Sequence, residues 1–101
     1  MTKLMAYYRT RKELFLKAHP MCDWKEEKRA TEIHHVRGRA GTLLLDERFW
    51  KALCSTAHDF VHENMAMARE VGLLCQVGEW NTAPDDDATR RLKCLIEDLT
   101  R

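Results

Sequence analysis

Four of the five histidines of this 101-residue chain lie in the stretch EIHHVRGRAGTLLLDERFWKALCSTAHDFVH, residues 32–62. His58 and His62 are four residues apart, in a segment (residues 55–64) whose pattern predicts a helix. That spacing puts both imidazole rings on one face of the helix, one turn apart. Two imidazoles placed in this way can bind the same metal ion.

The other two histidines of the stretch, His34 and His35, lie at the end of a short segment rich in β-branched residues. Residues 30–36 carry Thr, Ile and Val and are followed by a glycine-bearing loop, which predicts a β-strand. Residues 49–53 can return beside it as the second strand of a hairpin. If the hairpin folds against the helix, one histidine of the pair completes a three-ligand site with open positions for water or substrate. The other histidine can act as a general base, because an unperturbed imidazole has a pKa of about 6.5.

Each histidine pattern alone has an ordinary explanation. A single pair of histidines at helical spacing is more often a surface feature than a pair of ligands, and a His-His dipeptide commonly has no special role. Here the two patterns occur together, strand before helix, with Arg37 and Arg39 in the loop between them. This combination favours a metal site over coincidence.

Length and composition indicate one domain, residues 1–101. The chain is long enough for a modest core and too short for two domains. No apolar run approaches the ~20 residues that cross a bilayer, and residues 1–4 lack the apolar stretch of a secretory signal. The four cysteines are too few and too scattered for a disulfide scaffold, which is typical of a reducing compartment. We therefore expect a cytoplasmic location and no membrane role.

The net charge of +1 hides an uneven distribution. Residues 1–40 contain ten Lys and Arg against five Asp and Glu, whereas residues 41–101 contain seven against eleven. A basic half can attract a polyanion even when the whole chain is near neutral. A solvated helical surface explains the same charges equally well.

A helix is expected before the histidine-containing stretch. Residues 4–18 have a helical pattern that ends before a His-Pro pair, with Tyr7, Leu14 and Ala18 on the expected buried face. The central helix that carries His58 should begin at an N-cap, Ser55 or Thr56, since hydroxyl side chains accept hydrogen bonds from free amides of the first turn.

The C-terminal part of the chain is also expected to be helical. Residues 65–71 continue or restart the central helix, Gly72 stops it, and residues 76–84 form a linker. Three aspartates open a last helix at about residues 86–100, where negative charge suits the positive end of the helix dipole. Its apolar residues form one stripe, which we expect to pack on the domain's own core rather than on a partner helix. The stripe consists of Ala88, Leu92, Leu95, Ile96 and Leu99.

Residues 15–74 resemble the HNH nuclease family, especially its small bacteriophage members. The matching text is FLKAHPMC, EIHHVRGRAG, LLLDERFWKALC, HDFVHEN and AREVGLL. In that family the domain is a β-hairpin and a helix around one divalent metal. The resemblance implies an α+β fold with a ββα-metal (His-Me finger) core, preceded by the N-terminal helix and followed by additional C-terminal helices.

The resemblance also implies a role for each histidine of the stretch. His34, His58 and His62 would be the metal ligands and His35 the general base. The ion would be Mg, Mn, Ni or Zn, with imidazole ligands suiting magnesium least. Arg37 and Arg39 would contact phosphate, although a solvated loop accounts for them equally well.

The implied function is that of a metal-dependent endonuclease that hydrolyses phosphodiester bonds in double-stranded DNA. Small phage proteins of this family often work beside the packaging machinery, which implies the phage terminase large subunit as a partner and the bacterial host cytoplasm as the location. The alternative is a catalytically degenerate HNH-fold module that binds DNA or protein without cutting. Metal binding, and the effect of replacing His35 on cleavage, separate the two.

Two departures from the family pattern bear on the site. Phe49 stands where the family commonly has an asparagine that tethers the loop bearing the base. The two Cys-x2-Cys knuckles of many members are half lost, since Cys22 and Cys54 each lack a second cysteine partner. We therefore expect no structural zinc, because structural sites take four ligands. We expect Cys22 and Cys54 to lie close together, with Trp24, Ala57 and Trp50 filling the space by apolar packing.

Overall fold

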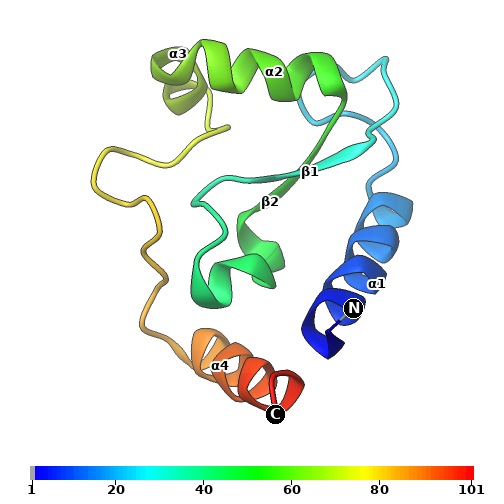
Figure 1. The fold of residues 1–101 in the computed structure, drawn as a ribbon. Helices are drawn as coiled ribbons and strands as arrows, with labels where there is room; N and C mark the ends of the chain where they lie inside the picture. Colours follow the sequence, from blue (N-terminus) through cyan, green and yellow to red (C-terminus); the bar gives the residue numbers. More distant parts are fainter. Residues whose placement is uncertain (1) are drawn as a thin grey trace.

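A short antiparallel hairpin, β1 (Glu32–His35) with β2 (Trp50–Leu53), lies at the centre of the fold. The computed structural model describes residues 2–101, and in this range four α-helices surround the two-stranded sheet, an α+β arrangement. In chain order the helices are α1 (Lys3–Ala18), α2 (Ser55–Glu63), α3 (Met65–Glu70) and α4 (Asp87–Leu99), with two short 3-10 turns, η1 (Gly41–Leu44) and η2 (Glu47–Phe49), between the strands. Figure 1 shows α2 and α3 at one end of the molecule, α4 at the other and α1 along the flank of the hairpin.

The register of the hairpin sets which way the paired histidines face. His34 is opposite Lys51 and His35 opposite Trp50. Because consecutive strand residues point to opposite faces, Glu32 and His34 face α2, whereas His35 faces α1. The predicted hairpin of residues 30–36 and 49–53 is therefore confirmed, with slightly shorter strands.

Two apolar clusters pack on the two faces of the hairpin. The first joins β2 to α2, α3 and the turn after α3, and consists of Cys22, Leu53, Cys54, Ala57, Val61, Ala68, Leu73 and Leu74, with Trp24 against it. The second joins the hairpin to α1 and α4 around Tyr8, Ile33, Leu45 and Trp50. Burial of these side chains holds each helix in place, at roughly 25 cal/mol per Å² of apolar surface.

The helix α1 occupies the predicted segment, and of the three residues predicted on its buried face only Tyr7 packs against the core. Tyr8 is the buried residue, and Tyr8 and Phe15 contact the Trp50 ring edge-on, with centroids 5.8 and 5.4 Å away. Leu14 is 47% exposed and Ala18 is exposed, so the prediction for those two residues is wrong. The position of Trp50, far away in sequence, decides which side of this helix is most buried.

The central helix begins without a hydroxyl cap. Its N-cap residue is Cys54, whose side chain makes no capping hydrogen bond, so the prediction of Ser55 or Thr56 is wrong. The side chain of Cys54 is instead buried in the first cluster. Beyond α2, the chain restarts as α3 and leaves it at Gly72, which has a φ of 82°.

The predicted stripe of α4 does pack on the domain's own core. Leu92, Leu95, Ile96 and Leu99 all join the second cluster. The helix is capped by Asp86, whose side chain accepts from the Thr89 amide. Among residues 2–101 no helix combines the length and apolarity that crossing a membrane requires.

The two core cysteines are neighbours, as expected. Cys22 and Cys54 belong to the same cluster and are free thiols. Burial raises the pKa of the Cys22 thiol, but hydrogen bonds from the amides of Cys54, Lys25 and Trp24 outweigh it, so that the pKa lies below its ordinary value.

The aromatic filling around these cysteines is only partly as predicted. Trp24 packs on the cluster that contains Ala57 and stacks on Phe60, with centroids 5.5 Å apart. Trp50 belongs to the other cluster, against α1, so that part of the prediction is wrong. Its place follows from the strand alternation, which turns Trp50 and Leu53 to opposite faces.

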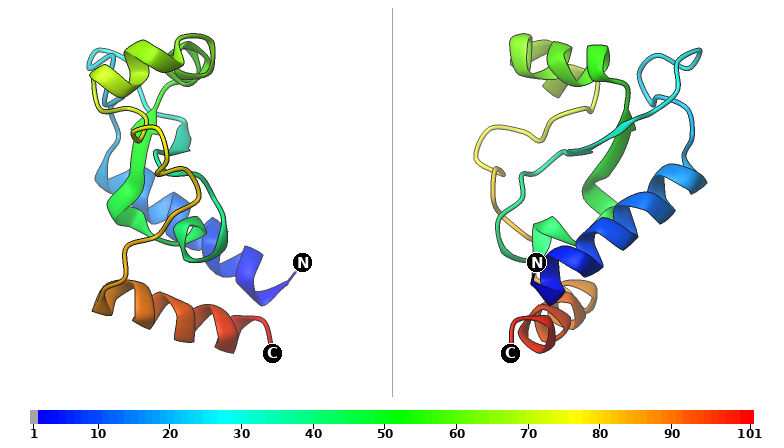
Figure 2. Two further views of the ribbon diagram at one scale, coloured as in Figure 1. Left: turned by 90° about the vertical axis from the view of Figure 1, so that its left-hand side faces the viewer. Right: turned by 45° about the vertical axis from the view of Figure 1, so that its right-hand side comes forward.

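The segment between α3 and α4, called the strap below, connects the α2–α3 end of the molecule to α4 (Figure 2). The amides of Cys75 and Asn81 donate to the carbonyls of Val36 and Arg37, at 3.1 and 2.9 Å. These bonds attach the strap to the loop that follows the paired histidines. The strap thereby becomes a wall of the site described next.

Candidate functional site

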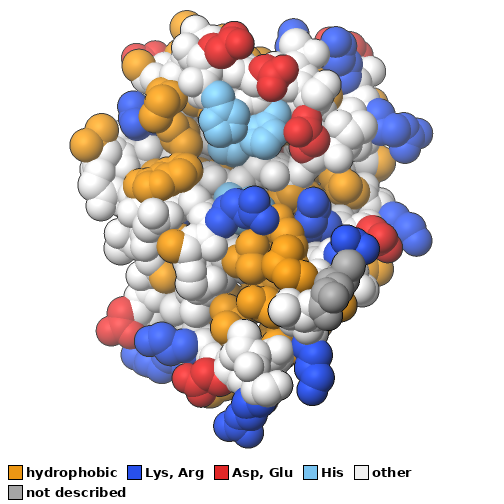
Figure 3. All heavy atoms as spheres, viewed as in Figure 1, with side chains coloured by type: hydrophobic (Ala, Val, Ile, Leu, Met, Phe, Trp, Pro, Cys, Tyr) orange, Lys and Arg blue, Asp and Glu red, His pale blue; other side chains and the backbone are white. Residues whose placement is uncertain are grey.

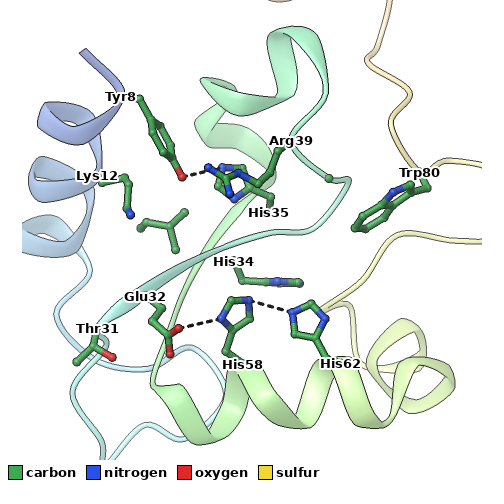
Figure 4. A pocket seen from close by; sticks show the side chains of 12 residues that line it. Tyr8, Lys12, Thr31, Glu32, His34, His35, Arg39, His58, His62 and Trp80 are labelled. Carbon is green, nitrogen blue, oxygen red and sulfur yellow. Dashed lines mark hydrogen bonds and ion pairs between the residues drawn. The ribbon is translucent and has the colours of Figure 1, made fainter. Parts of the chain in front are cut away.

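All four histidines of the central stretch line one open cavity of 540 Å³. Figure 4 shows His34, His58 and His62 grouped on the α2 side and His35 on the α1 side. In Figure 3 two histidine side chains lie together at the surface, next to apolar groups and with Lys and Arg side chains below them. Side chains that the sequence analysis did not select also line the cavity. These are Tyr8, Lys12, Thr31, Glu32, Ile33, Gly38 and Trp80. Arg39, which the sequence analysis did select, lines the cavity as well.

His58 and His62 meet as their spacing predicts. Their Nε2 atoms are 3.3 Å apart and their ring centroids 4.9 Å. Two nitrogens bound to one ion at about 2.1 Å in tetrahedral geometry would be separated by about 3.4 Å. The pair therefore already has the spacing of two ligands.

Glu32 orients one member of this pair. Its Oε1 lies 3.2 Å from Nδ1 of His58, so that Nδ1–H donates to the carboxylate. This bond selects the tautomer whose Nε2 lone pair faces His62 and the cavity. Glu32 was missed by the sequence analysis, although a signal was present: it lies two residues before His34, on the same face of the strand.

His34 is held from the opposite side of the site. It is 3% exposed, and its Nε2–H donates to the carbonyl of Leu73 at 2.5 Å, which leaves Nδ1 as the free acceptor. The pKa of His34 is lowered to about 4, chiefly by burial. The neighbouring His58 and His62 lower the pKa as well, whereas the hydrogen bond to Leu73 opposes the shift. The ring is therefore neutral at pH 7, the state in which imidazole binds metals.

The three rings form an open arrangement. The centroid of His34 lies 5.3 Å from that of His58 and 6.3 Å from that of His62. Rings around one tetrahedral ion would be about 5 Å apart, so the His34–His62 distance is the long one. Within residues 2–101, no three side chains of His, Cys, Asp or Glu already have the geometry of a metal site. The donor set suits a borderline metal ion, and His34 is the ligand that would have to move inward.

His35 lies on the other side of β1, among aromatic rings. Oη of Tyr8 is 3.5 Å from its Nε2, and the Trp50 ring is 5.5 Å away, centroid to centroid. The pKa of His35 is lowered to about 4, mainly by burial and also by the charge of Arg39, whereas a hydrogen bond to the carbonyl of Leu44 opposes the shift. His35 is thus neutral at pH 7 and is one of the residues that line the cavity.

Phe49 does not substitute for the missing asparagine. Its ring lies between two guanidinium groups, 4.9 Å from that of Arg37 and 5.3 Å from that of Arg48, and its carbonyl accepts from the Val36 amide. The carbonyl of Leu44 contacts His35 instead. The group that orients the predicted base is therefore a backbone atom.

The two loop arginines differ in their surroundings. Arg37 forms a salt bridge with Glu79 at 2.5 Å and its side chain is 16% exposed, so it fastens the strap. Arg39 lines the cavity with its guanidinium 5.5 Å from the Tyr8 centroid. Of the ion pairs in residues 2–101, none involves Arg39. Lys12 of α1 is a second cation at this cavity, and the sequence analysis missed it.

Comparisons with known proteins add no family to this description: no protein-family model matches the chain, and no match was found among curated proteins or solved structures.

Proposed function

We propose that this protein is a metal-dependent DNA endonuclease of the HNH type, with a ββα-metal core formed by β1, β2 and α2. In this proposal His34, His58 and His62 hold one divalent ion and His35 is the general base. The observation that carries it is the convergence of a strand pair and a helical pair of histidines on one open cavity that also contains unpaired cations. Its substrate would be the phosphodiester bond of double-stranded DNA.

The chemistry assigns each side chain a task. When bound, the ion would polarise the scissile phosphate and stabilise charge on the leaving oxygen. Nε2 of His35 would take a proton from water as the new oxygen–phosphorus bond forms and the bond to the leaving oxygen breaks. A phosphate anion near His35 would raise its pKa toward neutrality, because an opposite charge favours the protonated ring.

The cations of the cavity supply the attraction for a polyanion. Lys12 and Arg39 enter it from α1 and from the loop after β1. Their side chains can neutralise phosphates on either side of the scissile bond, which makes binding dependent on salt concentration. Arg37 is the weaker candidate for this role because Glu79 already neutralises it.

A second candidate function is a binding module that does not cut. It is favoured by the hydrogen bond between His34 and Leu73 and by the long His34–His62 distance, both of which keep the third ligand away from the other two. In either case the resemblance points to the phage terminase large subunit as a protein partner. A pull-down with that subunit would test this separately.

The test is cleavage of a supercoiled plasmid with Mg²⁺, Mn²⁺, Ni²⁺ or Zn²⁺ by the wild type, His35→Ala and His35→Gln. His19→Ala is the matched control, because His19 is exposed and stacks on Phe15 outside this cavity. We expect metal-dependent cleavage that both His35 variants lose by several orders of magnitude and the control retains. A folded wild type that binds DNA but cleaves with none of the metals would establish the binding module instead.

A further inference from the structure

A second cavity, of 360 Å³, adjoins the histidine cavity and is largely apolar. His34, His62 and Trp80 line both, so the two spaces are neighbours. Figure 3 shows apolar groups directly beside the histidines on this face. We propose that this second cavity binds one unpaired DNA base, so that the substrate is DNA with a nucleotide in a single strand or turned out of the duplex. The proposal deepens the proposed nuclease function and rests on it for the role of the neighbouring histidines.

The shape and lining of the cavity suit a flat aromatic ring. Its walls come from α2, α3 and the strap, with Val61, Met65 and Leu74 among them and Trp80 at the border with the histidines. Its volume falls in the range of about 300–1,000 Å³ that is usual for small-ligand pockets. A base that enters such a site loses its stacking in the duplex and regains it on the protein.

Trp80 is held in position although 53% of it is exposed. A Cβ atom on Gly38 would lie 3.2 Å from Cε2 of the indole, so the ring packs directly against the glycine backbone. The next residue, Asn81, donates its amide to the carbonyl of Arg37, and Arg37 in turn bonds Glu79. In Figure 4 the indole extends from the strap toward the histidine group. A half-exposed aromatic ring fixed in this way can stack a base with little loss of side-chain entropy.

The cavity also has a hydrogen-bond donor in its lining. Arg69 is among the residues that line it, and its guanidinium group carries only N–H donors. Every nucleobase presents a carbonyl oxygen or ring nitrogen that can accept from it.

The combination of the two cavities favours a nucleotide over an aromatic peptide side chain. A nucleotide joins a phosphate to an aromatic ring, and here a cavity with Lys12, Arg39 and the histidines adjoins an apolar one. A peptide aromatic group would fill only the second. A base inside an intact duplex cannot enter, since both its faces are already stacked on neighbouring bases.

The first test measures binding without catalysis. Protein freed of metal with EDTA is titrated into fluorescein-labelled dT8 and into an abasic strand of the same length, and binding is followed by anisotropy. The two strands carry the same phosphates, so only base binding separates them. Because stacking contributes ~1–3 kcal/mol per base, we expect the abasic strand to bind about 5- to 150-fold more weakly.

Variants of Trp80 assign that difference to this cavity. Trp80→Ala should bind dT8 as weakly as the wild type binds the abasic strand, whereas Trp80→Phe should keep most of the affinity. Trp24→Phe is the matched control, because Trp24 packs on the first apolar cluster, around Cys22 and Cys54. Equal binding of dT8 and the abasic strand by the wild type would overturn the proposal, as would unchanged dT8 affinity in a folded Trp80→Ala.

A second test separates this proposal from the nuclease proposal. With metal present, a duplex with one unpaired thymine should be cut at least 5-fold faster than the fully paired duplex, and Trp80→Ala should remove the preference. Base-dependent binding without any cleavage would end the nuclease proposal and keep the base site. Cleavage that depends on His35 but ignores both the unpaired base and Trp80 would end the base site and keep the nuclease. Displacement of dT8 by an acidic tryptophan-containing peptide, but not by thymidine 5′-phosphate, would assign the cavity to a protein partner and overturn the proposal.

Discussion

The carboxylate of Glu32 and the ring of His58 form the contact on which the helical half of the site depends. The contact spans residues 26 positions apart, at 3.2 Å, and sets which nitrogen of His58 faces the cavity. Carboxylates that orient a metal-binding histidine in this way also raise the basicity of the ligand. Glu32 is thus a positioning residue for the proposed ion.

Replacing Glu32 should weaken metal binding without unfolding the protein. We expect Glu32→Ala to lower the affinity for Zn²⁺ or Mn²⁺ about 10- to 100-fold, in line with the loss of other partners behind metal ligands. Glu32→Gln should lose less, because its amide oxygen can still accept from Nδ1–H of His58. Isothermal titration calorimetry measures both, with Glu63→Gln on the exposed side of α2 as the control. Equal affinities for Glu32→Ala and the control would contradict the assignment.

Gly38 is required for two reasons that can be separated experimentally. Its φ of 93° is strained for any residue with a Cβ atom, and a Cβ there would lie 2.5 Å from Oδ1 of Asn81 as well as against Trp80. Gly78 has nearly the same φ, 91°, with nothing within 4 Å of a Cβ atom. A difference in stability between alanine variants of the two glycines therefore measures how closely the strap packs against Gly38.

Alanine at these two glycines should have unequal effects. Gly78→Ala should cost about 1 kcal/mol of unfolding free energy through backbone strain alone. Gly38→Ala should cost roughly 1–3 kcal/mol more, since packed neighbours must shift, and should change the fluorescence of Trp80. Urea denaturation followed by tryptophan emission measures both quantities. If the two variants lose the same stability, the strap does not press on Gly38 as described.

At the scale of elements, α4 is fastened to the hairpin by one arginine. The guanidinium of Arg48, in η2, donates to Asp46 at 2.7 Å and to Asp86 at 2.8 Å. Asp46 is 2% exposed, and Asp86 is the N-cap of α4. Hydrogen bonds from the Arg48 guanidinium hold the pKa of Asp86 well below its usual range, with help from the Thr89 amide. This network joins Arg48 to the start of α4, about 40 positions later in the chain. It fixes the position of that helix more closely than apolar packing of the α4 stripe alone would.

Removing Arg48 should destabilise the fold far more than removing a surface arginine. Arg48→Ala leaves the Asp46 carboxylate buried without its cation, which costs about 3–5 kcal/mol in comparable cases. Arg90→Ala removes an exposed arginine that pairs with Asp85 and Asp87, and should cost less than about 1 kcal/mol. Thermal unfolding by circular dichroism compares the two. A similar loss in both variants would show that Asp46 is solvated in the folded protein.

At the scale of the whole molecule, two buried neutral histidines tie stability to pH. Burial holds the pKa of both His34 and His35 at about 4, below the value near 6.5 of an unfolded chain. The groups that face them are other histidines, Lys12, Arg39 and the Tyr8 hydroxyl, so the neutral rings avoid repulsion. Between pH 4 and 6.5 the unfolded chain binds more protons than the folded one, which favours unfolding.

The metal-free protein should therefore lose stability as pH falls from about 6.5 toward 4. Each histidine contributes up to about 3 kcal/mol, which is fully present above the unfolded pKa and lost as pH falls through the folded pKa. Urea denaturation at pH 7.5, 6.0 and 5.0 measures the slope. His35→Gln, which does not titrate in this range, should roughly halve it. A wild-type stability that is constant over this interval would mean that the two rings are protonated in the folded state.

Much of this architecture follows from local patterns in the sequence. A spacing of four residues placed His58 and His62 on one helix face, and the strand propensity of the residues around His34 predicted β1, because these periodicities are properties of the backbone itself. The apolar stripe of α4 was recognisable for the same reason, and the aspartates at its start were recognisable from the charge preference of a helix N-terminus. The spacing of the histidines selected them, the resemblance to HNH nucleases implied a role for each, and the structure brings all four to one cavity.

Only the tertiary structure decided which of several possible faces is buried and which polar atoms meet. The α1 face depends on Trp50, the free nitrogen of His34 depends on the carbonyl of Leu73, and the rigid position of Trp80 depends on Gly38. Each of these contacts joins residues about 40 positions apart. No local period specifies such contacts, since they follow from how the two clusters close around the hairpin. The sequence by itself thus determined the elements and the metal-ligand candidates, and packing between distant segments decided the surroundings that control their chemistry.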